Sequence, residues 1–229
     1  MINHPLLERV RVRSHAITDA TSLFSHLSGL RQVEIETSGI EIFDQFFYYC
    51  SALATIPPLD TSNGWKFSGM FQGCSALLTI PPLDTSKGTD FSAMFAWLID
   101  YGGKLCSLAV FDTSKATNCA SMFMGCSLRR IPELDLSSLV GSIEFCYCPS
   151  LYSIDVRGLG DALSEENQDR ITVNVEQSSL DAAALNAFYC NLAPVNNNRG
   201  MIYAFGTPGS MQPEHQPELA TSKGWIVYY

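Results

Sequence analysis

The sequence predicts an α/β solenoid, a chain wound into coils that stack on one another. Residues 52–62 (ALATIPPLDTS) recur almost unchanged as residues 76–86 (ALLTIPPLDTS), at an offset of 24 residues. Inside each copy the apolar residues first follow the period of a helix and then form a short strand-like segment. A unit this small cannot bury its own apolar face, so successive copies must stack and form a parallel sheet along one side. We therefore expect coils of about 24 residues, each with a helical turn and a short strand.

Further copies of the repeat flank these two. A third clear copy runs from Asp112 to Asp135, and weaker copies lie at residues 22–35 and 145–156. About six coils therefore cover residues 6–157. With 46% hydrophobic residues, the chain has enough apolar side chains to fill the core of such a stack.

The helical part of each coil is predicted from apolar residues at i, i+3, i+4 and i+7, which share one face of about two helical turns. Thr and Ser residues just upstream are suitable as N-cap or turn residues. A Leu-x-x-Ile segment then indicates a strand of about four residues, and a proline pair ends it because proline cannot donate to a ladder. The apolar sets are Phe43/Phe46/Phe47/Cys50, Phe67/Met70/Phe71/Cys74 and Cys119/Met122/Phe123/Cys126, and the proline pairs are Pro57-Pro58 and Pro81-Pro82.

The period is lost after Val156, which divides the chain into two parts. We expect residues 1–157 to form the solenoid, including an N-terminal capping coil, and residues 158–229 to form a C-terminal capping segment. A cap is needed because the last coil would otherwise leave an open apolar end and a free strand edge. Its expected elements are a helix from Leu180 to Leu192, a strand over residues 201–205, a loop over residues 206–217, a short helix closed at Gly224 and a strand over residues 225–229.

The charge balance and the hydropathy exclude several classes of function. The net charge of −9 argues against nucleic-acid binding, because neutralising phosphates requires a basic face. No apolar run of about 18 residues is present, so we expect no membrane insertion. The start of the chain lacks the charged-then-apolar order of a signal peptide, so we expect a soluble chain that is not exported by that route.

Four of the eight cysteines occupy equivalent positions of the repeat, at Cys50, Cys74, Cys126 and Cys148. A small apolar thiol at that position is expected to fill a ladder in the core. Two alternatives stay open: a zinc site that combines Cys146 and Cys148 with Cys119 and Cys126, and disulfide bonds. We expect no bound metal and no cofactor.

The repeated acidic residues do not indicate catalysis. Asp60, Asp84 and Asp112 each precede Thr-Ser, so we expect Asx or Ser/Thr turns, with calcium binding as the alternative. Nothing places a carboxylate pair on facing walls of a cleft, as glycoside hydrolysis requires. The four histidines lack a nucleophile context, and the Gly-Gly-Lys at residues 102–104 lacks the rest of a P-loop. We therefore expect a protein that is not an enzyme and has no catalytic residues.

Two segments carry a family resemblance. Residues 70–77 (MFQGCSAL), followed by residues 80–86 (IPPLDTS), resemble the BspA-like leucine-rich repeats of bacterial and protist surface adhesins and of phage tail-fibre and other virion proteins. Residues 220–227 (ATSKGWIV) resemble the segment that often closes such arrays in phage proteins. The resemblance covers about residues 20–157. It implies a right-handed, leucine-rich-repeat-like solenoid with a C-terminal α/β cap.

The same resemblance implies a function in recognition. We expect a non-enzymatic phage tail-fibre or tail-tip component in the virion that binds a glycan or protein receptor on the host surface. Its other partners would be virion subunits and further copies of itself, with a trimer favoured. The alternatives are a structural virion protein that joins or decorates other subunits, and an adhesin on a bacterial cell surface.

Candidate contact residues lie in the two segments that depart from the repeat. The copy between Asp84 and Asp112 is 28 residues long, so it carries about four inserted residues, within residues 96–104. The residues predicted to contact a receptor or partner are Trp97, Tyr101 and Lys104 in or beside this insertion, and Tyr203 and His215 near or in the C-terminal Gly/Pro loop. The alternative for Trp97 is that it replaces a core residue of its repeat.

Overall fold

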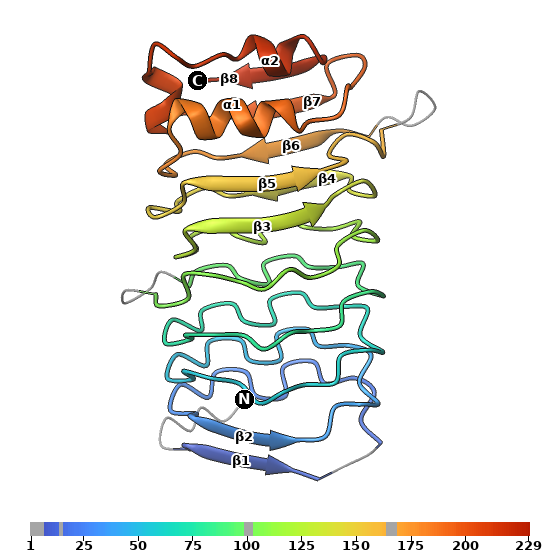
Figure 1. The fold of residues 1–229 in the computed structure, drawn as a ribbon. Coiled ribbons are helices and arrows are strands. Elements are labelled where there is room, and N and C mark those ends of the chain that lie inside the picture. Colours follow the sequence, from blue (N-terminus) through green and yellow to red (C-terminus); the bar gives the residue numbers. More distant parts are fainter. Residues whose placement is uncertain (1–6, 14–15, 99–102, 164–168) are drawn as a thin grey trace.

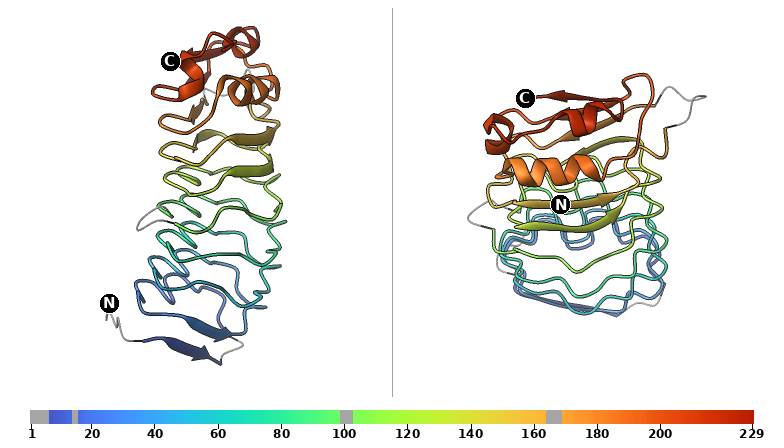
Figure 2. Two further views of the ribbon diagram at one scale, coloured as in Figure 1. Left: turned by 60° about the vertical axis from the view of Figure 1, so that its left-hand side comes forward. Right: turned by 45° about the horizontal axis from the view of Figure 1, so that its top comes forward.

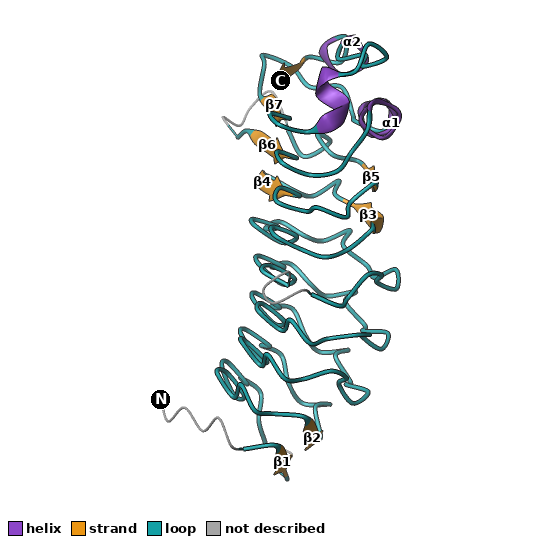
Figure 3. Cartoon of the chain, turned by 90° about the vertical axis from the view of Figure 1, so that its left-hand side faces the viewer, coloured by secondary structure: helices purple, strands orange, loops and turns teal. Residues whose placement is uncertain are grey.

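The computed structural model is a β-solenoid whose coils stack along one axis (Figure 1). It describes residues 7–13, 16–98, 103–163 and 169–229. Two further views show the same stack, with the helices gathered at its C-terminal end (Figure 2). Most of the repeat consists of turns and single bridges rather than long strands (Figure 3).

The regular elements are short. The strands are β1 (Arg9–Val12), β2 (Gln32–Ile35), β3 (Arg130–Asp135), β4 (Gly141–Glu144), β5 (Ser153–Arg157), β6 (Ile171–Asn174), β7 (Gly200–Tyr203) and β8 (Trp225–Tyr228). The helices are α1 (Ala182–Cys190), α2 (Glu218–Thr221) and the 3₁₀ helix η1 (Pro208–Met211). No described helix is long and apolar enough to cross a membrane.

One side of the stack is a parallel sheet that we call the bridge face. In the repeats it consists of single parallel bridges, which link Asp19 to Ile42, Ile42 to Lys66, Lys66 to Asp90 and Asp90 to Asn118. Towards the C-terminus it continues as the parallel sheet β4-β6-β7-β8. The winding therefore continues beyond residue 157, where the repeat pattern of the sequence ends.

The opposite side carries the proline pairs. There β1 pairs with β2, Thr55 bridges to Thr79, and β3 pairs with β5, all in parallel. Pro57-Pro58 and Pro81-Pro82 follow this bridge directly and lie outside any described strand. Proline has no N–H to donate, so the pairing between these two coils stops at the proline pairs, whereas β3 contains Pro132 and continues past it through a shift in register.

The expected helical turn in each coil is replaced by successive tight turns, three of them in residues 43–50. In residues 43–50, the N–H groups of Phe46 and Cys50 donate to the carbonyls three residues earlier, over 3.2 and 3.0 Å. The N–H groups of Gln45 and Phe47 instead donate to Ser68 and Met70 of the next coil, over 2.7 and 2.9 Å. In an α-helix, each N–H after the first turn would instead donate to the carbonyl four residues earlier in the same segment. In the stack, every second N–H group of the segment bonds to a carbonyl of the neighbouring coil, so the helix cannot form.

The buried side of this segment is nevertheless the predicted one. Phe43, Phe46, Phe47 and Cys50 are fully buried. Ring stacking continues from coil to coil, for example between Phe47 and Phe71 at a centroid distance of 6.0 Å. The complete ladder contains Phe24, Phe47, Phe71, Phe95, Phe123 and Phe145.

The elements expected over residues 180–229 are present at the C-terminal end. The Asp181 side chain caps α1 by accepting the Ala184 N–H over 2.8 Å. The Lys223 ammonium donates to the carbonyls of Tyr189, Cys190 and Leu192 at the other end of this helix, over 3.2, 2.7 and 2.9 Å. The buried Trp225 indole donates to the Ala193 carbonyl over 2.9 Å. The Lys-Gly-Trp segment therefore joins β8 to α1.

Candidate functional site

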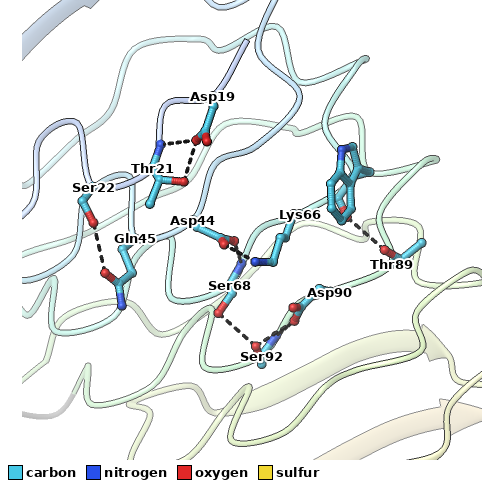
Figure 4. A network of polar contacts seen from close by, with 11 residues as sticks. Asp19, Thr21, Ser22, Asp44, Gln45, Lys66, Ser68, Thr89, Asp90 and Ser92 are labelled. Carbon is cyan, nitrogen blue, oxygen red and sulfur yellow. Dashed lines mark hydrogen bonds and ion pairs between the residues drawn. The ribbon is translucent and has the colours of Figure 1, made fainter. Parts of the chain in front are cut away.

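A network of charged and hydroxyl side chains covers the outer surface of the bridge face (Figure 4). Residues on either side of each inward phenylalanine point outwards, as alternation along an extended chain requires. Each coil therefore contributes two outward residues, and stacking aligns them in rows. One row is Asp19, Ile42, Lys66, Asp90 and Asn118, and the other is Thr21, Asp44, Ser68, Ser92 and Ala120.

The centre of this network connects three successive coils. The Lys66 ammonium lies 2.5 Å from the Asp44 carboxylate, which also accepts the Ser68 N–H over 3.2 Å. The Ser92 hydroxyl lies 2.9 Å from the Ser68 hydroxyl and 2.7 Å from Asp90 Oδ1. These contacts hold the polar groups in place before any ligand arrives.

The charges of the network are stabilised by their neighbours. The hydrogen bond to Asp44, together with the charges of Asp44, Asp90 and Asp19, raises the pKa of Lys66. Hydrogen bonds from the Thr21 hydroxyl and N–H lower the pKa of Asp19. Both side chains are therefore ionised at neutral pH, and the surface carries fixed charges of both signs.

Trp65 is the exposed aromatic residue beside this network. Its backbone is fixed between two coils, because its N–H donates to the Glu41 carbonyl over 3.0 Å and its carbonyl accepts the Thr89 N–H over 2.9 Å. The residue is 40% exposed. No described residue accepts a hydrogen bond from its indole N–H. An open aromatic surface beside fixed polar groups is suited to binding a sugar ring or a protein side chain.

The sequence prediction named other residues. Trp97 is half-buried, and its ring covers Gly125 in the next coil. Lys104 is exposed, and Tyr101 lies outside the described residues. Tyr203 stacks on Tyr228, with centroids 4.9 Å apart. Trp97 therefore packs on the next coil between the core residues Ala96 and Leu98 without being a core residue itself, and its ring is only partly available to a ligand. Contact of Trp97 with a receptor stays a prediction.

His215 belongs to a C-terminal aromatic cluster. Its Nε2 lies 3.1 Å from the Tyr189 hydroxyl, and its ring meets Tyr229 edge-on at 5.0 Å. Partial burial lowers the pKa of His215. The loop that carries it is docked on α1, since the Asn186 side-chain amide donates to the Glu214 carbonyl over 2.8 Å. The predicted residues therefore fall into separate regions, with Trp97 and Lys104 in the repeats and Tyr203 and His215 at the C-terminal end.

Trp65 was missed although the sequence holds a signal for it. The position just before the bridge residue is Glu41 in the preceding coil, Thr89 in the following coil and Thr117 in the one after. A tryptophan at a position that is polar in the neighbouring repeats stands out as an exposed aromatic residue. Comparing repeats position by position would therefore have found it.

The repeated cysteines and aspartates have structural roles. The buried Cys50 and Cys74 thiols donate to the carbonyls of Phe24 and Phe47 in the preceding coils, both over 3.0 Å. At each corner an aspartate carboxylate accepts from the serine two residues later, as Asp84 does from the Ser86 N–H and hydroxyl over 3.0 and 2.7 Å. The corners are therefore Asx turns. The described residues contain no group of three or more His, Cys, Asp or Glu side chains placed to hold a metal ion.

Comparison with known protein families gives one match. Residues 18–132 match the family model described as "Mycoplasma protein of unknown function, DUF285", which covers just over half of the chain. The chain belongs to the DUF285 family. The DUF285 region contains Trp65 and the whole network around Lys66, whereas the C-terminal helices lie outside it. No curated protein and no solved structure matches the chain.

Proposed function

We propose that this DUF285 protein is a non-enzymatic recognition protein that binds a surface receptor through its bridge face. The observation that carries the proposal is the exposed Trp65 beside the ordered network of Lys66, Asp44 and Asp90. Such a surface can pack against one face of a sugar ring while the fixed charges and hydroxyls bond its hydroxyl groups. In this proposal each contact through the exposed Trp65 is weak, and several copies of the protein strengthen binding through avidity.

The proposed setting is a phage tail fibre or tail tip that contacts the host cell. The BspA-like repeat motif and the Ala-Thr-Ser-Lys-Gly-Trp segment at residues 220–225 support it. In this proposal the solenoid is right-handed and leucine-rich-repeat-like, and residues 158–229 act as its cap. The protein works as a homo-oligomer, for which a trimer is the simplest form, beside other virion subunits.

A second candidate is an adhesin on a bacterial cell surface. The family description, which names a Mycoplasma protein, favours a cellular origin over a virion. Both candidates use the same recognition surface. They differ in whether the receptor belongs to the host of a phage or to a tissue or neighbouring cell.

Binding to glycans tests the proposed surface directly. The protein, displayed in several copies on beads, is applied to host-type cells and to arrays of their surface glycans. We expect saturable binding that Trp65→Ala weakens by about 30-fold, the loss expected for a central aromatic contact. Tyr152→Ala is the matched control, because Tyr152 is 58% exposed and lies outside the bridge face. An unchanged affinity in Trp65→Ala contradicts the proposed site. No binding at multivalent display contradicts the receptor function and favours a structural virion protein.

A further inference from the structure

We infer that Cys126 and Cys148 form a disulfide bond that joins two successive coils under oxidising conditions. Their sulfur atoms lie 3.3 Å apart. Both side chains are fully buried, so the pair sits inside the core of the stack. The inference concerns the stability of the scaffold and is independent of the proposed receptor function.

The backbone around the pair suits a disulfide. The Gly125 N–H donates to the Cys146 carbonyl over 2.9 Å, so the two segments are direct neighbours in the stack. Neighbouring chains in a sheet lie about 4.8 Å apart, within the Cα separation of roughly 4.4–6.8 Å that disulfides span. Bringing the sulfurs to bonding distance, about 2.0 Å, needs only a rotation of each side chain.

The other cysteines of the ladder provide a contrast. The Cys50, Cys74 and Cys148 thiols each donate to a phenylalanine carbonyl of the preceding coil, over 3.0, 3.0 and 3.1 Å. Cys148 in addition lies within hydrogen-bond distance of the Cys126 sulfur. The spacing between Cys50 and Cys74 is 24 residues, whereas Cys126 and Cys148 are separated by 22. The closer sulfur contact therefore belongs to this shorter coil and does not follow from ladder position alone.

The contact also prepares one sulfur to react. The Cys126 and Cys148 sulfurs share a hydrogen bond, which lowers the pKa of Cys148. The thiolate is the nucleophile in thiol–disulfide exchange. Cys148 is therefore the sulfur that attacks first.

The oxidant is a small disulfide such as oxidised glutathione. The Cys148 thiolate attacks it, forms a mixed disulfide and releases one glutathione thiolate. The Cys126 thiolate then attacks the Cys148 sulfur, forms the Cys126–Cys148 bond and releases the second glutathione thiolate. Two protein thiols are oxidised, one glutathione disulfide is reduced, and both thiol protons end on the released glutathione. Since both sulfurs are buried, exchange takes place during folding or when this part of the chain opens.

The test is refolding of the full chain in a glutathione redox buffer, followed by disulfide mapping by mass spectrometry. A Cys106→Ser/Cys190→Ser background removes the two exposed thiols. We expect a loss of two hydrogen masses, a cross-linked peptide pair containing Cys126 and Cys148, and two fewer titratable thiols. Because the bond closes one complete coil, the unfolding equilibrium constant of the oxidised protein should be about 100-fold or more below that of the reduced protein.

Single replacements separate this pair from the rest of the ladder. Cys126→Ala and Cys148→Ala should each abolish the bond, while Cys74→Ala, at an equivalent buried position, should retain it. Disulfide mapping of the protein with an unchanged ladder shows whether the Cys126–Cys148 bond forms. It therefore decides the inference even if one of these replacements prevents folding. Natively folded protein that keeps all its buried thiols free after oxidative refolding overturns the inference, as does a bond between any other pair.

Discussion

The ring of Trp97 lies directly over Gly125 in the next coil. A Cβ at Gly125 would stand 3.0 Å from Cε3 of this ring, and a Cβ at Gly73 would stand 2.9 Å from the ring of Tyr49. All four residues have positive φ angles, between 55° and 73°. Large residues and glycines thus alternate from coil to coil in one row of left-handed positions. Each glycine leaves room for the side chain of the preceding coil, which explains why Trp97 is packed.

Replacing Gly125 tests this alternation. Gly125→Ala should destabilise the fold by about 2–3 kcal/mol, because alanine meets both the left-handed backbone and the Trp97 ring. Gly206→Ala is the control, since its φ of 67° is similar and its nearest contact, Gln177, lies at 3.6 Å. That variant should lose only about 1 kcal/mol. Urea unfolding measures the loss of stability in both variants. Equal losses would show that the Trp97 ring does not contribute to the destabilisation by Gly125→Ala.

The buried Thr85 hydroxyl should stabilise the corner between two coils. It donates to the Asp112 carbonyl over 2.8 Å, so Thr85→Val removes a hydrogen bond made by a buried hydroxyl. We expect a loss of about 1–1.5 kcal/mol. Thr117→Val removes a longer bond of 3.3 Å at an exposed residue and should cost about 0.5 kcal/mol or less. Chemical denaturation measures the loss of stability in both variants. A smaller loss for Thr85→Val than for Thr117→Val would contradict a stabilising role of the Thr85 hydroxyl.

The stacked phenylalanine ladder should dominate the stability of the repeats. Phe71 is fully buried and stacks on Phe47 and Phe95, both at 6.0 Å. Phe71→Ala should therefore cost about 3–5 kcal/mol. Trp65→Ala, at an exposed position, should change the stability by no more than about 0.5 kcal/mol. The midpoints of urea unfolding test this contrast, and comparable losses would mean that the indole of Trp65 is packed.

The corner aspartates should make the fold sensitive to acid. Hydrogen bonds from the serine two residues later lower the pKa values of Asp60, Asp84 and Asp135 below the ordinary 3.8. The folded chain therefore binds these protons less tightly than the unfolded chain. The contribution of these carboxylates to the free energy of unfolding is complete well above pH 3.8. It disappears as the pH falls through the lowered pKa values.

A melting series from pH 7 to pH 2.5 tests this acid sensitivity. Asp84→Asn keeps an acceptor oxygen for Ser86 but cannot ionise, so its Tm should fall less steeply below about pH 4. Asp84→Ala loses the turn contacts and should melt lower at every pH. Parallel curves for the wild type and Asp84→Asn would show that this carboxylate does not contribute.

Much of the fold could be predicted from the repeat. The spacing of Phe43, Phe46, Phe47 and Cys50 identified the buried side of each coil, and the Asp-Thr-Ser corner identified a turn. Both depend on residues close together in the chain, so local chemistry is sufficient. The candidate site was harder to predict, because the insertion indicated Trp97, whereas the exposure of Trp65 depends on how its coil stacks on the neighbouring coils.

The sequence by itself determined the coil length, the inward residues and the positions at which proline and aspartate end each segment. Only the tertiary structure decided that residues 43–50 form three successive tight turns, because half of their N–H groups bond to a neighbouring coil. It also decided that Trp97 covers Gly125, that Trp65 is open beside Lys66, and that the sulfurs of Cys126 and Cys148 meet. Each of these features depends on contacts between neighbouring coils, and the register between coils sets them once the chain has stacked.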